Sequence, residues 1–448
     1  MIPYLDIAPF VRECDATIRV PGSKSISNRA LILAALCSGK VTLEGMLKSE
    51  DVDLMREALE SLGLRVETTD DGRTVVIEGC GGELPAKNSK IFVGNAGTVA
   101  RFLTALLALQ QDAVYELDGS EAMRERPMGE LLSFLENNGA SCTFGNLDGC
   151  FPFRLYAKGL GEQYAQIDAT KSSQVLSAIL MIAPTINHKY TLKFDGGTVS
   201  APFVDITLSM MRTFSPPESF SSSFSANSIE IISEGYRADD FHFMVEPDAT
   251  AASYFLTLPI VVGGKCELDG IHEVMLQGDA AYLEILKQVG VQVSKTECGV
   301  QSSASSLAKG GTFDFNDISD TFLSLAAVSP LLSSSLTING IAHTRKQETD
   351  RVSAMATELR KLGQSVEETE DQLRITPNLD RLRNLAINGL EIDTYKDHRF
   401  AMSFGILGCH DLLGNGQPWL RINDPNCCAK TFPAFFEKLE YVRDLSHS

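Results

Sequence analysis

Apolar residues recur along this chain at the helical spacing i, i+3, i+4 and i+7, in segments that often end in Gly before a β-like run. A stripe of this kind predicts a helix that buries one face and exposes the other. The pattern is clear at residues 54–63, 131–139, 282–290 and 354–363, and it is weaker at residues 206–214 and 432–439.

A second kind of segment alternates with the first and is apolar on most sides, which predicts a helix buried inside its domain. These segments start near Lys24, Asn95, Ser172, Asp248, Asp320 and Asp397, so the starts are spaced by roughly 71 to 77 residues. Between the helices lie runs of β-branched residues, such as residues 74–78 and 229–232, which predict strands. The pattern indicates six copies of one unit with two helices and several strands each, an α/β organisation.

Six such units can form one solenoid or two globules of three units. We favour two globules because the chain has 448 residues and a single core rarely grows beyond ~250–300 residues. The predicted domains are residues 21–240 for the N-terminal globule, and residues 1–20 plus 241–448 for the C-terminal globule, with a crossover at residues 234–240. The Ser-rich stretch 215–225 is expected to be a surface loop or hairpin of the first globule.

Composition narrows the classes of function. The net charge of −19 argues against a nucleic acid or an anionic membrane surface as partner. No apolar run approaches the ~20 residues of a membrane-spanning helix, and the chain start lacks a secretory pattern, so we expect a cytoplasmic protein. The ten cysteines include no C-x-x-C pair and the histidines no H-E-x-x-H spacing, so we expect reduced thiols and no metal site.

Four of the apolar helices open with residues suited to binding an anion. A helix N-terminus presents free N–H groups and a partial positive charge, which favour phosphate or carboxylate. Each start taken alone fits a structural cap better, but four starts at equivalent positions of a repeat favour a shared function. They lie at residues 24–29, 94–101, 171–174 and 397–399.

If these helices run parallel within each globule, their N-termini share one face, and two opposed faces form a cleft lined with positive dipoles. Such a cleft explains how an acidic protein holds anionic substrates. Charged clusters at residues 124–126, at residues 345–351 and at Lys430 fit the same place, although each cluster alone also fits a solvated surface run or a cap.

Several specific blocks occur in one order between residues near 15 and near 440. They are P-G-S-K-S-I-S-N-R from Pro21 to Arg29, then G-N-A-G-T, R-E-R-P, S-S-Q, E-T-D-R, D-H-R-x-A-M and D-P-x-C-x-x-K-T-F-P. In these blocks the chain resembles the 5-enolpyruvylshikimate-3-phosphate (EPSP) synthase family. The resemblance implies a two-domain inside-out α/β barrel built from six repeats, the enolpyruvyl transferase fold, with the active site in the interdomain cleft.

The family's reaction is the sixth step of the shikimate pathway. The enolpyruvyl group of phosphoenolpyruvate moves to the 5-hydroxyl of shikimate 3-phosphate by addition and elimination through a tetrahedral intermediate, and phosphate leaves. The resemblance implies no cofactor, no metal, no nucleic-acid or membrane partner, and a monomer whose partners are these two small substrates. Glyphosate is the family's known inhibitor.

The resemblance also implies roles for residues at matching positions. Phosphoenolpyruvate is bound by Lys24, Gly97, Arg126, Gln174, Arg351, Arg399 and Lys430. Shikimate 3-phosphate is bound by Ser25, Arg29, Ser172, Ser173, Gln174, Ser200, Asp320 and Gln347. The catalytic residues are Asp320, Glu348 and Lys24. Glu348 is expected to protonate the methylene carbon and later deprotonate it, Asp320 to accept the hydroxyl proton, and Lys24 to assist the departing phosphate.

This chain departs from the family's usual pattern on the side of the shikimate phosphate. Gln347 stands where the family commonly has a lysine that binds this phosphate, and Lys346 lies one position early. His343 replaces a common Asn, and Phe203 lacks the hydroxyl of the aromatic commonly found near the shikimate ring. We hypothesise that Lys171, at the start of the expected phosphate-binding helix, supplies the missing cation; the alternative is an exposed lysine.

Two other functions compete with this one. The UDP-N-acetylglucosamine enolpyruvyl transferases share the fold and the donor, but they use a mobile-loop cysteine, and residues 110–123 here contain none. A catalytically silent anion-binding module is the second alternative. The presence of Asp320, Glu348, Lys24 and Arg399 argues against it.

Overall fold

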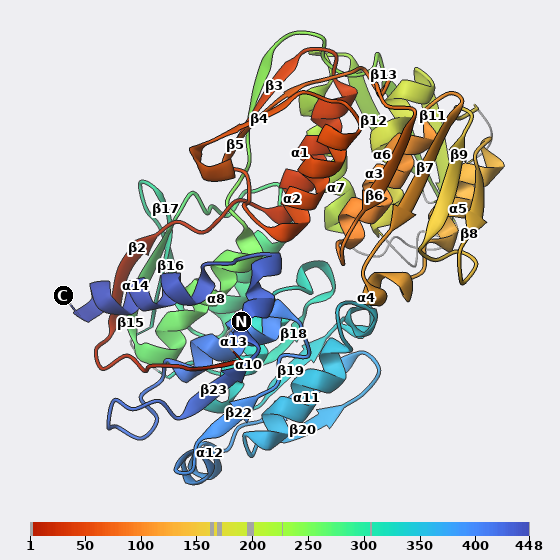
Figure 1. The fold of residues 1–448 in the computed structure, drawn as a ribbon. Coiled ribbons are helices and arrows are strands. Elements are labelled where there is room, and N and C mark those ends of the chain that lie inside the picture. Colours follow the sequence, from red (N-terminus) through yellow and green to blue (C-terminus); the bar gives the residue numbers. More distant parts are fainter. Residues whose placement is uncertain are drawn as a thin grey trace. The chain divides into compact units, whose positions relative to one another are not determined.

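A computed structural model describes residues 3–161, 165–167, 173–194, 201–225, 227–304 and 307–447 of the chain. The chain divides into two compact units, Gly22–Glu246 and a unit made of Met1–Pro21 together with Pro247–Ser448. Each unit combines several small sheets with helices, so the α/β class expected from the sequence is confirmed (Figure 1).

Three four-stranded sheets occur among the described residues of the Gly22–Glu246 unit, and they share one topology. In each sheet an edge strand pairs in parallel with the second strand, and the other pairs are antiparallel. The sheets are, in strand order, β14 (Phe241–Met244), β3 (Lys40–Glu44), β5 (Thr74–Glu78) and β4 (Val66–Thr69); β6 (Asn88–Phe92), β7 (Ala113–Asp118), β9 (Phe153–Ala157) and β8 (Ser141–Phe144); and β10 (Ala165–Ile167), β11 (Lys189–Phe194), β13 (Ser228–Ser233) and β12 (Phe220–Ser225).

Strand β14 is the edge strand of the first of these sheets, although it comes much later in the chain than the other three strands. Its residues, which the sequence alone assigned to the C-terminal globule, pair in parallel with β3, with Phe241 opposite Val41. The Ser-rich stretch ends in β12, which pairs antiparallel with β13, as a hairpin requires.

The apolar helices of this unit pack against one another. They are α1 (Lys24–Leu36), α3 (Gly97–Ala108) and α6 (Ser173–Ile186). All twelve residues of α3 are buried, because its sequence is apolar except at Thr98, Arg101 and Thr104. The amphipathic helices are α2 (Glu50–Ser61), α5 (Gly129–Asn137) and α7 (Ala201–Phe214), and the short elements are η1 (Asp70–Gly72) and α4 (Glu121–Arg124). The apolar helices α1, α3 and α6 begin at or next to the polar residues that the sequence analysis named as helix starts.

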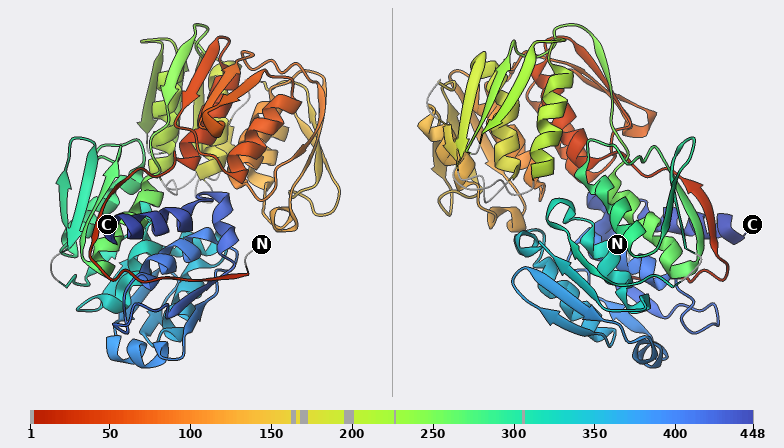
Figure 2. Two further views of the ribbon diagram at one scale, coloured as in Figure 1. Left: turned by 60° about the vertical axis from the view of Figure 1, so that its left-hand side comes forward. Right: turned by 180° about the vertical axis from the view of Figure 1, so that it is seen from behind.

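The other unit repeats this topology. Its sheets, within the described residues, are β2 (Cys14–Ile18), β15 (Gly264–Asp269), β17 (Gly299–Ala304) and β16 (Gln292–Lys295); β18 (Thr312–Asp314), β19 (Leu336–Asn339), β21 (Gln372–Thr376) and β20 (Ser365–Glu368); and the three-stranded β22 (Leu390–Ile392), β23 (Leu420–Asn423) and β1 (Tyr4–Asp6). The first pair of each sheet is again parallel. Both N-terminal strands join strands from much later in the chain, and Figure 2 shows the red N-terminal segment running along this unit.

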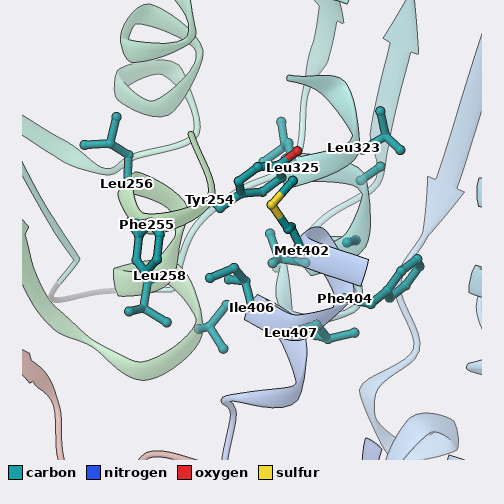
Figure 3. Close-up of a cluster of buried hydrophobic side chains, with 14 of the residues drawn as sticks. Tyr254, Phe255, Leu256, Leu258, Leu323, Leu325, Met402, Phe404, Ile406 and Leu407 are labelled. Atoms are coloured by element: carbon teal, nitrogen blue, oxygen red, sulfur yellow. The ribbon is translucent and has the colours of Figure 1, made fainter. Parts of the chain in front are cut away.

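The core of this unit lies around three apolar helices, α8 (Ala249–Val262), α10 (Phe322–Val328) and α13 (His398–Gly408), which contact one another. Figure 3 shows side chains of all three helices in one cluster, among them Tyr254, Leu325 and Met402. The remaining elements are η2 (Gly278–Ala281), α9 (Tyr282–Gln288), η3 (Asn316–Ile318), η4 (Ser329–Leu331), η5 (Ala342–Lys346), α11 (Arg351–Lys361), α12 (Leu379–Ala386), η6 (Pro425–Lys430) and α14 (Phe435–His447).

Every helix predicted from the i, i+3, i+4, i+7 pattern is present, as α2, α5, α7, α9, α11 and α14. Helix α14 begins at Phe435, later than the expected residue 432; the helical conformation is disfavoured at Phe432 because Pro433 follows it. Within the described ranges, no helix is both long and apolar enough to cross a bilayer.

Candidate active site

In the Gly22–Glu246 unit, the start of α1 brings three candidate residues together. Lys24 is the first residue of the helix, and its Nζ lies 3.5 Å from Oδ2 of the buried Asp51 on α2. Ser25 follows, and its backbone oxygen accepts a hydrogen bond of 3.0 Å from Arg29 Nη1. The first two turns of α1 thus place a lysine, a half-buried hydroxyl and a guanidinium near one helix end.

Arg29 is a buried cation whose partners among the described residues are neutral. Its Nε donates to Thr207 Oγ1 (2.8 Å) and its Nη2 to Ser177 Oγ (3.1 Å), while its side chain is 1% exposed. Burial lowers the pKa of Arg29 to about 9. Because a buried charge without a counter-charge is unfavourable, this guanidinium is suited to an incoming carboxylate or phosphate.

A second cationic cluster surrounds the start of α3. A Cβ atom placed on Gly97 would lie 2.7 Å from Arg126 Nη2 and 3.0 Å from Arg101 Nη1, so only glycine permits this approach. Arg126 Nη1 donates a hydrogen bond of 3.3 Å to the backbone carbonyl oxygen of Asn95. Burial, and then the charge of Arg126, lowers the pKa of Arg101 to about 9. Two guanidinium groups and free helix amides thus share one small region.

The start of α6 is described in part. Ser173 and Gln174 are its first two residues, and both are half-buried. Two further residues expected to bind shikimate 3-phosphate, Ser172 and Ser200, lie outside the described residues, as does Lys171. The hypothesis that Lys171 replaces the usual lysine therefore stays a prediction.

In the other unit, Arg351 is the centre of a network that joins most of the candidate residues there. This arginine is 1% exposed. Its Nη1 lies 2.8 Å from Asp320 Oδ1 and its Nη2 lies 2.9 Å from Glu348 Oε2. Its Nε lies 2.7 Å from Asp397 Oδ2. Burial lowers the pKa of Arg351, but the three carboxylates outweigh burial and leave the pKa above its ordinary value.

A second buried arginine, Arg399, shares a carboxylate with the first. Its Nη2 lies 2.5 Å from Asp320 Oδ2, and its backbone N–H donates to Asp397 Oδ1 at 3.0 Å. Its Nη1 donates to Tyr254 Oη at 3.3 Å. Its Nε is buried and has no hydrogen-bond partner among the described residues. This unused donor marks a direction in which an acceptor from a ligand fits.

Lys430, the last residue of η6, completes the network by placing its Nζ 2.7 Å from Glu348 Oε1. Glu348 therefore lies between an ammonium and a guanidinium. A carboxyl group held this way can exchange a proton while its position stays fixed. In total, three cations face three carboxylates, so this cluster alone carries no excess positive charge.

Gln347 points toward the same network, since its Oε1 accepts a hydrogen bond from Arg351 Nη1. Sequence reasoning expected it at the shikimate phosphate, and the structure gives it an additional partner in Arg351. The partners missed by that reasoning include Asp51 of Lys24, Asp397 of Arg351, and Tyr254 of Arg399. Asp397 stood in the D-H-R block, which was a usable signal, whereas Tyr254 lies in an apolar helix without a motif.

The structure thus groups Asp320, Gln347, Glu348, Arg351, Arg399 and Lys430 in one unit, and Lys24, Ser25, Arg29, Gly97 and Arg126 at helix starts of the other. Among the residues that the structure describes, no group of three or more His, Cys, Asp or Glu side chains is arranged to hold a metal ion.

Comparisons with known proteins identify the family of this chain. The family model of EPSP synthase (3-phosphoshikimate 1-carboxyvinyltransferase) matches residues 11–439. A 3-phosphoshikimate 1-carboxyvinyltransferase of Opitutus terrae is 46% identical over 447 residues, covering 99% of this chain and 98% of the relative. One of Nostoc punctiforme is 39% identical over 434 residues, covering 97% and 98%.

Solved structures show the same fold. An EPSP synthase from Acinetobacter baumannii superposes with a TM-score of 0.78 at 23% identity, covering 98% of this chain and 97% of that one. The enolpyruvyl transferase NikO from Streptomyces tendae superposes with a TM-score of 0.70 at 15% identity, covering 98% and 97%. Because the family model matches residues 11–439, nearly the whole chain, this chain belongs to the EPSP synthase (3-phosphoshikimate 1-carboxyvinyltransferase) family.

Proposed function

We propose that this chain transfers the enolpyruvyl group of phosphoenolpyruvate to the 5-hydroxyl of shikimate 3-phosphate, releasing phosphate. The observation that carries the proposal is the ion-pair network around Arg351, in which the residues of three separate motif blocks meet: Glu348, Arg399 and Lys430. Family membership gives the reaction, and this network supplies charged groups suited to it.

The reaction balances in two steps. In the first, the 5-hydroxyl oxygen bonds to C2 of phosphoenolpyruvate, the hydroxyl proton passes to a base, and a second proton adds to the methylene carbon C3. In the second, the bond from C2 to the phosphate oxygen breaks and a proton leaves C3, which restores the double bond. The proton held by the base then passes to the departing phosphate.

We assign the proton transfers at C3 to Glu348 and the removal of the hydroxyl proton to Asp320. One carboxylate oxygen of Glu348 contacts Lys430 and the other contacts Arg351. These two cations fix the orientation of the carboxyl group, as proton transfer to a carbon requires. Asp320 bridges Arg351 and Arg399, which fixes it beside both proposed phosphoenolpyruvate ligands. Positioned acid–base groups of this kind typically contribute ~10²–10⁴-fold each.

We propose a substrate site that uses residues of both units, and the charges of the described residues support this proposal. The network around Arg351 has as many carboxylates as cations, so it does not attract a dianion by itself. Arg29 and Arg126, in contrast, are cations that make their described hydrogen bonds to neutral groups. We therefore propose that Lys24, Gly97, Arg126 and Gln174 join Arg351, Arg399 and Lys430 in binding phosphoenolpyruvate, and that Lys24 also assists the departing phosphate.

We assign shikimate 3-phosphate to Ser25, Arg29, Ser172, Ser173, Gln174, Ser200, Asp320 and Gln347. Among the described residues the hydrogen-bond partners of Arg29 are neutral, which supports a role for Arg29 in binding an anionic group of this substrate. We further propose that the six sheets are six copies of one repeat in an inside-out barrel, that the two units are the two domains, and that closing of the cleft excludes water. The protein is proposed to act as a monomer.

The test is phosphate release from phosphoenolpyruvate with each of two acceptors. Shikimate 3-phosphate should give one phosphate per acceptor consumed, and UDP-N-acetylglucosamine should give none. Release with the UDP-sugar alone would support the other enolpyruvyl transferase class. Binding of phosphoenolpyruvate without release with either acceptor would identify a silent anion-binding module.

A further inference from the structure

Glu358 is a fully buried carboxylate on α11, two helical turns after Arg351, so both side chains project from one face of the helix. It accepts a hydrogen bond of 2.5 Å from the Tyr395 hydroxyl. It also accepts from Lys361 Nζ at 2.9 Å and from the backbone N–H of Asp393 at 3.2 Å. Nothing in the proposed reaction uses this group.

Two of these partners lie in the short segment 393–397, which joins β22 to α13. Tyr395 and Lys396 have φ values of 55° and 59°, so two successive residues with side chains adopt the left-handed conformation. This backbone is unfavourable unless the surroundings hold it. Glu358 is placed to do so, because it binds the segment at its first residue and again at Tyr395.

The other end of the same segment is Asp397, which is tied to the same helix. Its carboxylate accepts from Arg351 Nε at 2.7 Å and caps α13 by accepting from the Arg399 N–H at 3.0 Å. Segment 393–397 is therefore attached to α11 at three points: at Glu358, at Arg351, and at Lys361, whose Nζ lies 2.6 Å from Asp393 Oδ2. A shift at the first attachment moves Asp397, and with it the two arginines.

We propose that Glu358 is a positioning residue, which sets the orientation of Arg351 and Arg399 by holding segment 393–397. This inference rests on the proposed function, in which both arginines bind phosphoenolpyruvate. Burial, and then the hydrogen bond to Glu358, raise the pKa of Tyr395, so the hydroxyl stays protonated and continues to donate over the ordinary pH range.

The principal test is Tyr395→Phe, which removes one hydrogen bond to Glu358 and keeps the ring that packs edge-on against Phe400 at 5.6 Å. We expect the KM for phosphoenolpyruvate to rise about 3- to 10-fold, and the KM for shikimate 3-phosphate to stay within about twofold. Glu358→Gln should shift the same constant further in the same direction. If that variant fails to fold, Tyr395→Phe alone decides.

The matched control is Tyr282→Phe in the same unit. It removes a buried tyrosine hydroxyl that is 2.7 Å from Thr257 Oγ1, on a helix that does not carry the network. Because Tyr282 is 1% exposed and Tyr395 is 38% exposed, this control should lower the melting temperature at least as much as Tyr395→Phe, and it should leave both KM values unchanged. A rise of both KM values together in Tyr395→Phe, or no rise at all, overturns the positioning role.

A second measurement separates this proposal from the proposed function. Amide hydrogen exchange at Arg399, whose N–H is bound by Asp397, should be faster in Tyr395→Phe than in the wild type, and unchanged in Tyr282→Phe. This readout needs no turnover. An inactive wild type with altered exchange would refute the reaction alone, and an active wild type with unaltered exchange would refute the positioning role alone.

Discussion

Replacing Gly97 with alanine should weaken phosphoenolpyruvate binding selectively. The new Cβ would lie 2.7 Å from Arg126 Nη2, where ordinary contact begins near 3.4 Å. The guanidinium must therefore move by roughly 0.7–1 Å, and misplacement on this scale costs up to ~10²-fold in a positioned group. We expect the KM for phosphoenolpyruvate to rise about 10- to 100-fold, which corresponds to ~1.4–2.7 kcal/mol.

Steady-state kinetics with each substrate varied in turn measures this effect. The KM for shikimate 3-phosphate should change by less than about threefold, because Arg29 keeps its own partners. The melting temperature should fall only slightly, since the nearest atom that must move is the end of the flexible Arg126 side chain. Gly129→Ala is the matched control, because a Cβ on the first residue of α5 meets nothing within 4 Å.

A KM for phosphoenolpyruvate that stays within twofold of the wild type would refute this reasoning. It would mean either that Arg126 does not bind this substrate or that the side chain moves at no cost. Arg126→Gln separates these two cases. A large rise in KM for that variant would leave the role of Arg126 intact and place the error in the estimate of the displacement.

Glu348→Gln should lower kcat by at least ~10²-fold while fluorescence titration still detects phosphoenolpyruvate binding, because the carbon loses its acid–base group and the cations remain; near-normal turnover would contradict the assignment. Arg29→Met should leave the melting temperature equal or higher, because the unpaired buried charge is removed, while the KM for shikimate 3-phosphate rises at least ~100-fold. Asp279 has its pKa raised to about 7, chiefly by burial and then by the charge of Asp320. The folded state therefore holds a proton that the unfolded state releases, so this residue's contribution to stability falls as pH rises from about 4 to about 7; a thermal-unfolding series should show a flatter pH profile for Asp279→Asn, and an identical slope would refute the shift.

The helices of this fold were readable from the sequence because their apolar periodicity is local. The pattern at residues 354–363 predicted α11, and the pattern at residues 131–139 predicted α5. The motif blocks likewise identified Glu348 and Lys430, whose side chains the structure places 2.7 Å apart. Both kinds of signal lie in short stretches of chain, where residue type and spacing carry the information.

Contacts between distant stretches were not readable in this way. Arg29 donates a hydrogen bond to Thr207, which lies 178 positions later, and no pattern in either segment predicts this contact. The pairing of β14 with β3 was missed for the same reason, because the sequence of a four-residue strand does not indicate which strand it pairs with. Glu358 looked like an ordinary helix residue until its burial and its three partners were known.

The strands that pair across the chain also bear on how the protein is made. The Gly22–Glu246 unit has every one of its described strands once β14 has been synthesised, so it can fold while the ribosome is still producing the rest. The other unit cannot do so, because β1 and β2 emerge first and their partners β23 and β15 emerge long afterwards. Strands β1 and β2 are thus synthesised before most of their unit and must wait for later strands before they can pair, so this unit is completed after the other one.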